Sequence, residues 1–219
     1  MHGVGSRNKL TPSHARLYPG DSTLDVLGRA LCTAGCLPRK ELHEAWEMAT
    51  RVSAHFRGGR VVDLCAGFGL LAQFLALLDP GAHALAVDAW LPANHLKVHG
   101  AVADAFPHLR GRVQFVAAKL QTIALGPHDI VVSAHACGAL TDDVLVRAHA
   151  AGARVAVLPC CHATRFRADL AHETDRAAAV DALRCADLRD RGYAVWTEAI
   201  PTCVSPKNRL LFGASRVAP

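Results

Sequence analysis

Residues 61–71 read VVDLCAGFGLL and decide the fold of this 219-residue chain. The apolar run at the start of the segment predicts a β-strand, and Leu70 opens a run with the periodicity of a helix. Between them stand Asp63, small residues and the glycines Gly67 and Gly69, which let the backbone pass close to a ligand without a side chain in the way. Because amides at the start of a helix point at such a ligand, the segment predicts a nucleotide-binding turn.

Short apolar runs alternate with longer helical patterns on both sides of this turn. We expect strands at 60–65, 82–87, 113–118, 130–134 and 154–158, and helices at 70–78, 92–106, 141–151 and 173–191. Thr141 is the expected cap of the third of these helices. The alternation favours a parallel sheet with helices on both faces.

The last two expected strands, 193–200 and 210–214, are joined by PTCVSPKN. This connection is too short for a crossover helix, so the pair is expected to be antiparallel. The sequence therefore predicts an α/β, Rossmann-like sheet of seven strands with an antiparallel C-terminal strand pair.

Ahead of the turn, the sequence predicts an added region. Residues 1–20 lack periodicity and are expected to form a flexible basic arm. Residues 21–57 carry two helical patterns, the first with Asp21 as its cap and Gly35 as its stop, the second with Pro38 in its first turn. We expect a helical N-terminal cap over 21–57 and the α/β domain over 58–219.

Composition and charge limit the cellular compartments and the binding partners that fit this chain. The longest apolar stretches are too short to span a bilayer, and the polar start does not have the core of a signal peptide. A cytoplasmic protein with eight reduced cysteines is expected. The net charge is +5, and residues 1–60 hold nine Lys/Arg against five Asp/Glu. This excess can attract phosphate, as in RNA, or simply keep a surface solvated.

Two classes of cofactor fit the turn. Gly67, Gly69 and Ala72 satisfy the dinucleotide fingerprint, and Asp88 lies near the distance expected of a ribose-binding acid, so a nicotinamide-dependent oxidoreductase is an alternative. Against it, Asp63 falls inside the strand, and Cys65 stands where dinucleotide folds keep a bulky apolar residue. A carboxylate there suits a cofactor with a cationic amino-acid tail.

DLCAGFG resembles the first motif of class I S-adenosylmethionine-dependent methyltransferases, with matches at Asp63, Cys65, Gly67 and Gly69. The resemblance implies that S-adenosylmethionine is the cofactor and that these residues, with Ala66, hold its methionine portion. It also implies cofactor contacts for residues that follow later strands, which are Asp88 on the ribose, Ala89 and Trp90 on the adenine, and His135.

The adenine contact departs from the family pattern. Where many such enzymes carry an Asp or Asn, this chain has VAAKLQ, and Lys119 cannot accept the hydrogen bond of the adenine amino group. Backbone or Gln121 is the expected substitute.

Histidines and cysteines follow the fourth and fifth expected strands, as SAHACGALTD and VLPCCHATR. Carboxyl ends of parallel strands line the binding crevice. We therefore expect the side chains of these two segments to gather beside the transferable methyl group, namely those of His135, Cys137, Cys160, Cys161 and His162.

These segments resemble a subgroup of class I methyltransferases that carries H-x-C-G, P-C-C-[HY] and P-K-N-R. Here the motifs stand at 135–138, 159–162 and 206–209. The subgroup includes tRNA ribose 2′-O-methyltransferases that act on the acceptor stem and a set of methyltransferase-like proteins. The resemblance implies RNA as the acceptor.

Four interpretations of the thiols and imidazoles stay open. In the first, His135 or His162 is a general base, and in the second, Cys160 is a nucleophile. In the third, the thiols bind a metal, and in the fourth, the thiols and imidazoles are structural. Adjacent Cys160 and Cys161 are not expected to point at one ion, so we predict no metal site and take His135, Cys160 and His162 as the catalytic candidates.

Arg39, Lys40 and Cys161 are the candidates for acceptor binding. The expected function is S-adenosylmethionine-dependent methyl transfer to RNA. A protein or small-molecule acceptor, and a non-catalytic binding module that keeps the fold, stay as alternatives.

Overall fold

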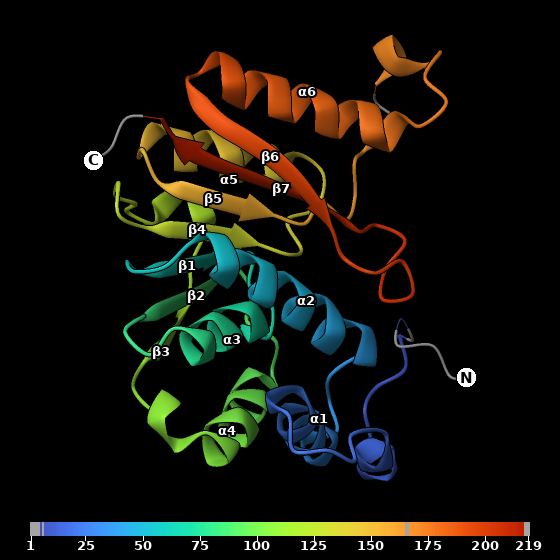
Figure 1. Ribbon diagram of the computed structural model, residues 1–219, viewed down its shortest axis with the longest axis vertical. Helices are drawn as coiled ribbons and strands as arrows, with labels where there is room; N and C mark the ends of the chain where they lie inside the picture. The colour runs from blue at the N-terminus through green and yellow to red at the C-terminus, as the bar shows by residue number, and fades with distance from the viewer. Residues whose placement is uncertain (1–4, 6, 165–166, 217–219) are drawn as a thin grey trace.

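The computed structural model describes residues 5, 7–164 and 167–216, and within them a seven-stranded sheet forms the centre of the molecule (Figure 1). Its strands are β1 (Val61–Leu64), β2 (Ala84–Asp88), β3 (Val113–Ala117), β4 (Ile130–Ser133), β5 (Arg154–Val157), β6 (Tyr193–Ala199) and β7 (Arg209–Ser215). They lie in the order β3-β2-β1-β4-β5-β7-β6. β1 to β5 are parallel, and β7 runs antiparallel to both β5 and β6. The predicted sheet and its antiparallel pair are confirmed.

Helices cover both faces of the sheet, as the alternating pattern predicts. They are α1 (Thr23–Ala34), α2 (Arg39–His55), α3 (Leu70–Leu78), α4 (His95–Ala105), α5 (Ala139–Ala150) and α6 (Arg176–Asp190). Successive strand residues point to opposite faces, so Val61 and Val132 pack in the cluster that includes α1 to α4, whereas Val62 and Val131 pack in the cluster of α5 and α6. Each face of the sheet therefore has its own core.

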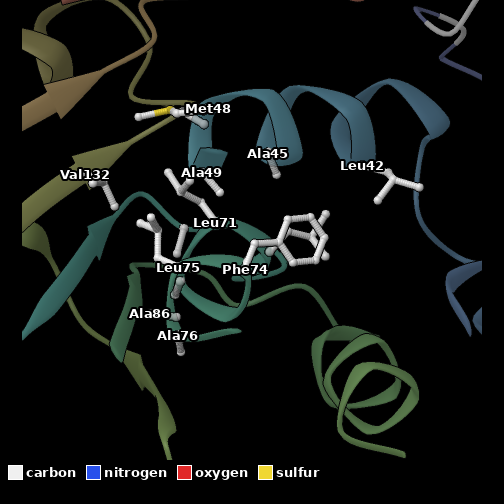
Figure 2. Packing of buried hydrophobic residues seen from close by; sticks show 14 of the residues in the cluster. Leu42, Ala45, Met48, Ala49, Leu71, Phe74, Leu75, Ala76, Ala86 and Val132 are labelled. Atoms are coloured by element: carbon white, nitrogen blue, oxygen red, sulfur yellow. The ribbon is translucent and has the colours of Figure 1, made fainter. Parts of the chain in front are cut away.

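Helix α2 packs directly on α3 (Figure 2). Leu42, Ala45 and Ala49 repeat at helical spacing and face Leu71 and Phe74 of α3, and all five are buried. Replacing a side chain as large and buried as that of Phe74 by alanine costs about 3–5 kcal/mol. This packing fixes where the first turn of α2 lies, and that turn reaches the functional site.

Two helix caps differ from expectation. The side chain of Ser22, rather than Asp21, caps α1 by accepting a hydrogen bond from the backbone N–H of Asp25. Helix α5 starts at Ala139, and the hydroxyl of Thr141 donates to the carbonyl of Ala136 instead of capping the helix. Helix α1 therefore starts two residues after its expected cap, and α5 starts two residues before its expected cap.

The described part of residues 1–20 is packed against the body of the molecule rather than extended from it. Pro12–Leu17 form a 3-10 helix, η1, and the side chains of Leu10 and Tyr18 are buried. The backbone N–H of Leu10 donates to the carbonyl of Leu37 at 2.8 Å. The expectation of a free arm therefore fails for this part, and residues 1–4 and 6 lie outside the described residues.

Within the described residues, none of the helices combines the length and the apolar character that crossing a bilayer requires.

Candidate functional site

A cavity of about 640 Å³ opens at the carboxyl ends of β1 to β4. Its size falls in the range of small-molecule and cofactor sites, and parallel sheets bind ligands at this edge. The lining includes residues that follow each of the four strands, among them Cys65, Gly67, Asp88, Ala89, Trp90, Lys119, Gln121, His135 and Cys137. Most residues assigned to the cofactor from sequence thus lie around one cavity.

The two glycines of the turn serve different purposes. Both have positive φ, +53° at Gly67 and +66° at Gly69. A Cβ added to Gly67 would meet no protein atom within 4 Å, whereas one added to Gly69 would lie 2.5 Å from the ring of Phe115. Gly67 therefore keeps space open beside the cavity, and Gly69 allows the helix to pack on the sheet.

The turn is held in place by Asp88. Oδ2 of Asp88 accepts a hydrogen bond from the Gly67 N–H at 2.9 Å, and Oδ1 accepts one from the Trp90 N–H at 3.0 Å. The Ala66 N–H donates to the carbonyl of Val87 at 2.9 Å. These two turn amides are thus engaged within the protein rather than aimed at a ligand. A carboxylate oxygen can accept two hydrogen bonds, so each oxygen of Asp88 can accept a further one from a ligand in the cavity.

Asp63 lies below the cavity rather than in its lining. Its side chain is 1% exposed, and its Oδ2 accepts a hydrogen bond from the Ala72 N–H at 3.3 Å. Burial, with a smaller contribution from the charge of Asp88, raises the pKa of Asp63 to about 8. The residue joins β1 to α3, and it borders a small inner hollow of about 30 Å³ under the turn.

The predicted adenine side of the cavity carries Ala89 and Trp90, and the Trp90 residue is 87% exposed. Lys119 and Gln121 lie on the same cavity. The Gln121 Nε2 donates to Asp143 at 3.0 Å, so this amide is oriented by α5. An exposed indole at the rim is available to cover a planar ring.

Glu41, from the first turn of α2, borders both the cavity and the inner hollow together with His135. Burial, aided by the charge of Glu44, raises the pKa of Glu41 to about 7. Burial lowers the pKa of His135, which favours the neutral imidazole. The site thus holds two groups able to accept a proton. Glu41 was not among the residues predicted from sequence.

The two predicted acceptor-binding cations do not line the cavity. Arg39 is only 8% exposed, and Lys40 lies 2.5 Å from Oε1 of the buried Glu44. Neither is a free positive charge at the site. The prediction that they bind the acceptor is therefore not supported by their placement, because Arg39 is buried and Lys40 is paired with Glu44.

Three thiols meet between the segments that follow β4 and β5. The Sγ atoms of Cys137 and Cys160 are 3.3 Å apart, and those of Cys137, Cys160 and Cys161 all lie within 4.8 Å of one another. Burial raises the pKa of Cys137 and of Cys160. A cysteine nucleophile requires the opposite shift, so the environment of Cys160 does not favour that interpretation.

His162 lies away from the cavity, which corrects the expectation that it sits beside the methyl group. Its Nε2 is 2.9 Å from Oδ1 of Asp181 in α6. Asp181, 2% exposed, also accepts hydrogen bonds from Arg184 at 3.3 Å and from Arg209 at 2.9 Å. His162 and the arginine of the P-K-N-R motif, Arg209, therefore take part in one ionic network around the buried Asp181, which supports the loops of the site.

The sequence matches a family described as a methyltransferase domain over residues 40–165, more than half of the chain. None of the curated proteins matches the chain.

Solved structures of low sequence identity share the fold. An O-methyltransferase family protein from Burkholderia thailandensis is 19% identical with a TM-score of 0.54, and the match covers 98% of this chain and 66% of that one. A proposed RNA methyltransferase from Pyrococcus horikoshii is 14% identical with a TM-score of 0.52, covering 83% and 87%. The S-adenosylmethionine-dependent methyltransferase SibL is 21% identical with a TM-score of 0.52, covering 94% and 66%.

This chain therefore spans about two thirds of the length of the first and third of these structures. The likeness at such identities concerns the fold, whereas the family follows from the sequence match, and the chain belongs to the methyltransferase-domain family.

Proposed function

We propose that this protein is an S-adenosylmethionine-dependent methyltransferase whose acceptor is RNA. The observation that carries the cofactor assignment is the hydrogen bond between Gly67 and Asp88, which places an open glycine turn and a carboxylate side by side on one cavity. The family match favours methyl transfer over the nicotinamide alternative.

The residues around the cavity fit this cofactor. Asp88 would accept hydrogen bonds from the ribose hydroxyls, Gly67 would give the methionine portion room, and Ala89 and Trp90 would lie against the adenine. When bound, S-adenosylmethionine supplies an electrophilic methyl group. The side-chain N–H of Gln121 donates to Asp143, which leaves its amide oxygen as the acceptor for the adenine amino group in place of the Asp or Asn of the family pattern.

The chain itself supplies proton acceptors where β4 ends. Burial lowers the pKa of His135 and so favours its neutral form, and the pKa of Glu41 is raised to about 7, so either side chain can take the proton that an attacking hydroxyl or amine loses. If one of them is the base, His135→Ala or Glu41→Gln lowers kcat by about 10²–10⁴-fold. If both variants keep wild-type turnover, the reaction relies on positioning alone.

RNA is favoured by three observations. The H-x-C-G, P-C-C-H and P-K-N-R motifs resemble those of a subgroup with tRNA enzymes, the net charge is +5, and one structural neighbour is described as an RNA methyltransferase. Exposed Arg176 and Lys207 border a second hollow of about 730 Å³ with Cys160 and Cys161. These cations replace Arg39 and Lys40 as the candidates for phosphate contact.

The acceptor is tested by supplying the purified protein with S-adenosylmethionine labelled in the methyl group and with separated RNA, protein and small-molecule fractions of a lysate. The proposal expects nuclease-sensitive label in the RNA fraction, with none for Asp88→Ala at limiting cofactor. Label confined to protein or small molecules overturns RNA as the acceptor and leaves methyl transfer intact. A protein that binds S-adenosylmethionine but labels no fraction would be a binding module.

A further inference from the structure

The three thiols of Cys137, Cys160 and Cys161 form a cluster that the proposed methyl transfer does not use. One comes from the segment after β4 and two from the segment after β5, and their Sγ atoms lie within 4.8 Å of one another. All three are free thiols; Cys137 and Cys161 are exposed, and Cys160 is half-buried. The cluster is therefore reachable from solvent.

The two segments are held together by the backbone. The N–H of Gly138 donates to the carbonyl of Cys161 at 2.8 Å, and Arg184 donates to the carbonyl of Gly138 at 3.2 Å. Gly138 adopts a φ of +61°, which favours glycine, and Ala163 has a φ of +48°. The Sγ atoms of the neighbouring Cys160 and Cys161 lie within 4.8 Å of each other and of Cys137 Sγ, so the two side chains point to the same side.

The distances suit a single ion. Zinc binds thiolate sulfur at about 2.3 Å in a tetrahedral arrangement, which corresponds to sulfur atoms about 3.8 Å apart. The 3.3 Å between Cys137 and Cys160, and the limit of 4.8 Å for the whole cluster, lie on either side of that value.

The chemistry of the cluster also favours a cation. Thiolate sulfur is a preferred ligand of Zn²⁺, and a bound ion keeps such thiols deprotonated and offsets the repulsion of their charges.

We propose that Cys137, Cys160 and Cys161 bind one thiophilic divalent metal ion, Zn²⁺ in the reduced cell interior, with the fourth position open. Three protein ligands and one open position are typical of zinc sites that bind a further molecule. Cys137 also lines the main cavity, and Cys160 and Cys161 line the second hollow, so the ion would lie at the boundary between the two.

The test uses the full chain, purified with a thiol reductant, stripped with a chelator and then freed of both additives under anaerobic conditions. Zn²⁺ is titrated in competition with a colorimetric chelator, and Co²⁺ is added to a second sample to record its absorption spectrum. We expect one equivalent of Zn²⁺ to be bound, and Co²⁺ to show the sulfur-to-metal charge-transfer bands of thiolate ligands.

Single variants identify the ligands. Cys137→Ser and Cys161→Ser should lower the Zn²⁺ affinity by at least ~10–100-fold, the loss found even for residues that only support a ligand. Cys203→Ser, which changes an exposed cysteine outside the cluster, should bind Zn²⁺ like the wild type.

The proposal is overturned if the wild-type chain binds no Zn²⁺ in competition, if its Co²⁺ spectrum lacks the thiolate bands, or if all three variants bind equally well. A Cys137–Cys160 disulfide, found by mass spectrometry in protein purified without reductant and reformed in preference to metal binding, would assign the pair to redox chemistry instead. Calorimetry with S-adenosylmethionine on the same samples keeps this outcome separate from the proposed function, because metal binding by the thiols does not require the cofactor.

Discussion

The backbone N–H of Gly67 donates a 2.9 Å hydrogen bond to Oδ2 of Asp88, and this contact joins the glycine turn after β1 to the end of β2. The same carboxylate accepts the Trp90 N–H at 3.0 Å. One side chain therefore shapes the turn and faces the cavity, which makes it the residue whose loss is most informative.

Asp88→Ala should lower the affinity for S-adenosylmethionine by about 10–100-fold, because hydrogen bonds to a charged group contribute about 1.5–3 kcal/mol. Isothermal titration calorimetry measures the change. Asp104→Ala, which removes an exposed carboxylate paired with Arg110, is the matched control and should bind like the wild type. Equal affinities for Asp88→Ala and the wild type would reject the ribose assignment.

The glycines of the turn should separate binding from stability. Gly67→Ala should cost about 1–2 kcal/mol of unfolding free energy, for its left-handed backbone, and weaken cofactor binding because the new methyl group enters the open space. Gly69→Ala adds a clash with Phe115 and Ala86 and should cost about 2–4 kcal/mol. Urea denaturation and calorimetry report the two quantities. If Gly67→Ala binds as tightly as the wild type, the space beside Gly67 does not hold the ligand.

Glu41 should make stability depend on pH. Its folded-state pKa of about 7 lies above its ordinary value of 4.5, so the folded protein retains a proton that the unfolded chain releases. The stability contributed by this protonated form is present below pH 4.5, is lost as the pH rises toward 7, and stays lost above it.

Glu41→Gln should therefore be more stable than the wild type at pH 8, by about 1–3 kcal/mol, and should show no such gain at pH 4. Urea denaturation at the two pH values measures this difference. Asp63, with a pKa of about 8, also lowers the unfolding free energy as the pH rises. The contribution of Glu41 is therefore taken from the difference between the variant and the wild type at each pH. Glu173→Gln, an exposed change, should alter stability by less than ~0.5 kcal/mol. A gain for Glu41→Gln that is equal at both pH values would contradict the assigned pKa.

Asp181 should matter for folding more than for cofactor binding. Asp181→Ala leaves Arg184, whose side chain is 5% exposed, without one of its partners, and breaking a buried pair costs about 3–5 kcal/mol. Asp187→Ala breaks an exposed pair with Arg191 and should cost less than ~1 kcal/mol. Denaturation measures both. A stable Asp181→Ala protein with impaired turnover would return His162 to the catalytic candidates.

The fold could be predicted closely because its signals are local. Alternating apolar runs, the glycine turn and the short PTCVSPKN connection specify strands, crossovers and the antiparallel end, and observed boundaries differ from the expected ones by a few residues. Gly35 ends α1 with a φ of +67°, as its place in the pattern indicates. Cap positions such as Ser22 are harder to predict, because the neighbouring Asp21 and Ser22 have similar preferences for the N-cap position.

The site could be predicted only where strand ends determine it. Asp88 and His135 follow parallel strands and therefore meet at one edge. Glu41 depends on how α2 packs over α3, and the orientation of His162 depends on Asp181, which is 19 residues further along the chain. The convergence of Cys160 and Cys161 on Cys137 depends on the path of the segment after β5, which no residue pattern indicates. These features come from tertiary packing, which the local sequence does not specify.

Calorimetric titration of the wild-type protein with S-adenosylmethionine, beside an identical titration with NAD, distinguishes the two cofactor classes. We expect saturable binding of one S-adenosylmethionine per chain, weakened in Asp88→Ala, and no binding of NAD. Binding of NAD with no response to S-adenosylmethionine, or affinity for S-adenosylmethionine that Asp88→Ala leaves unchanged, would contradict it.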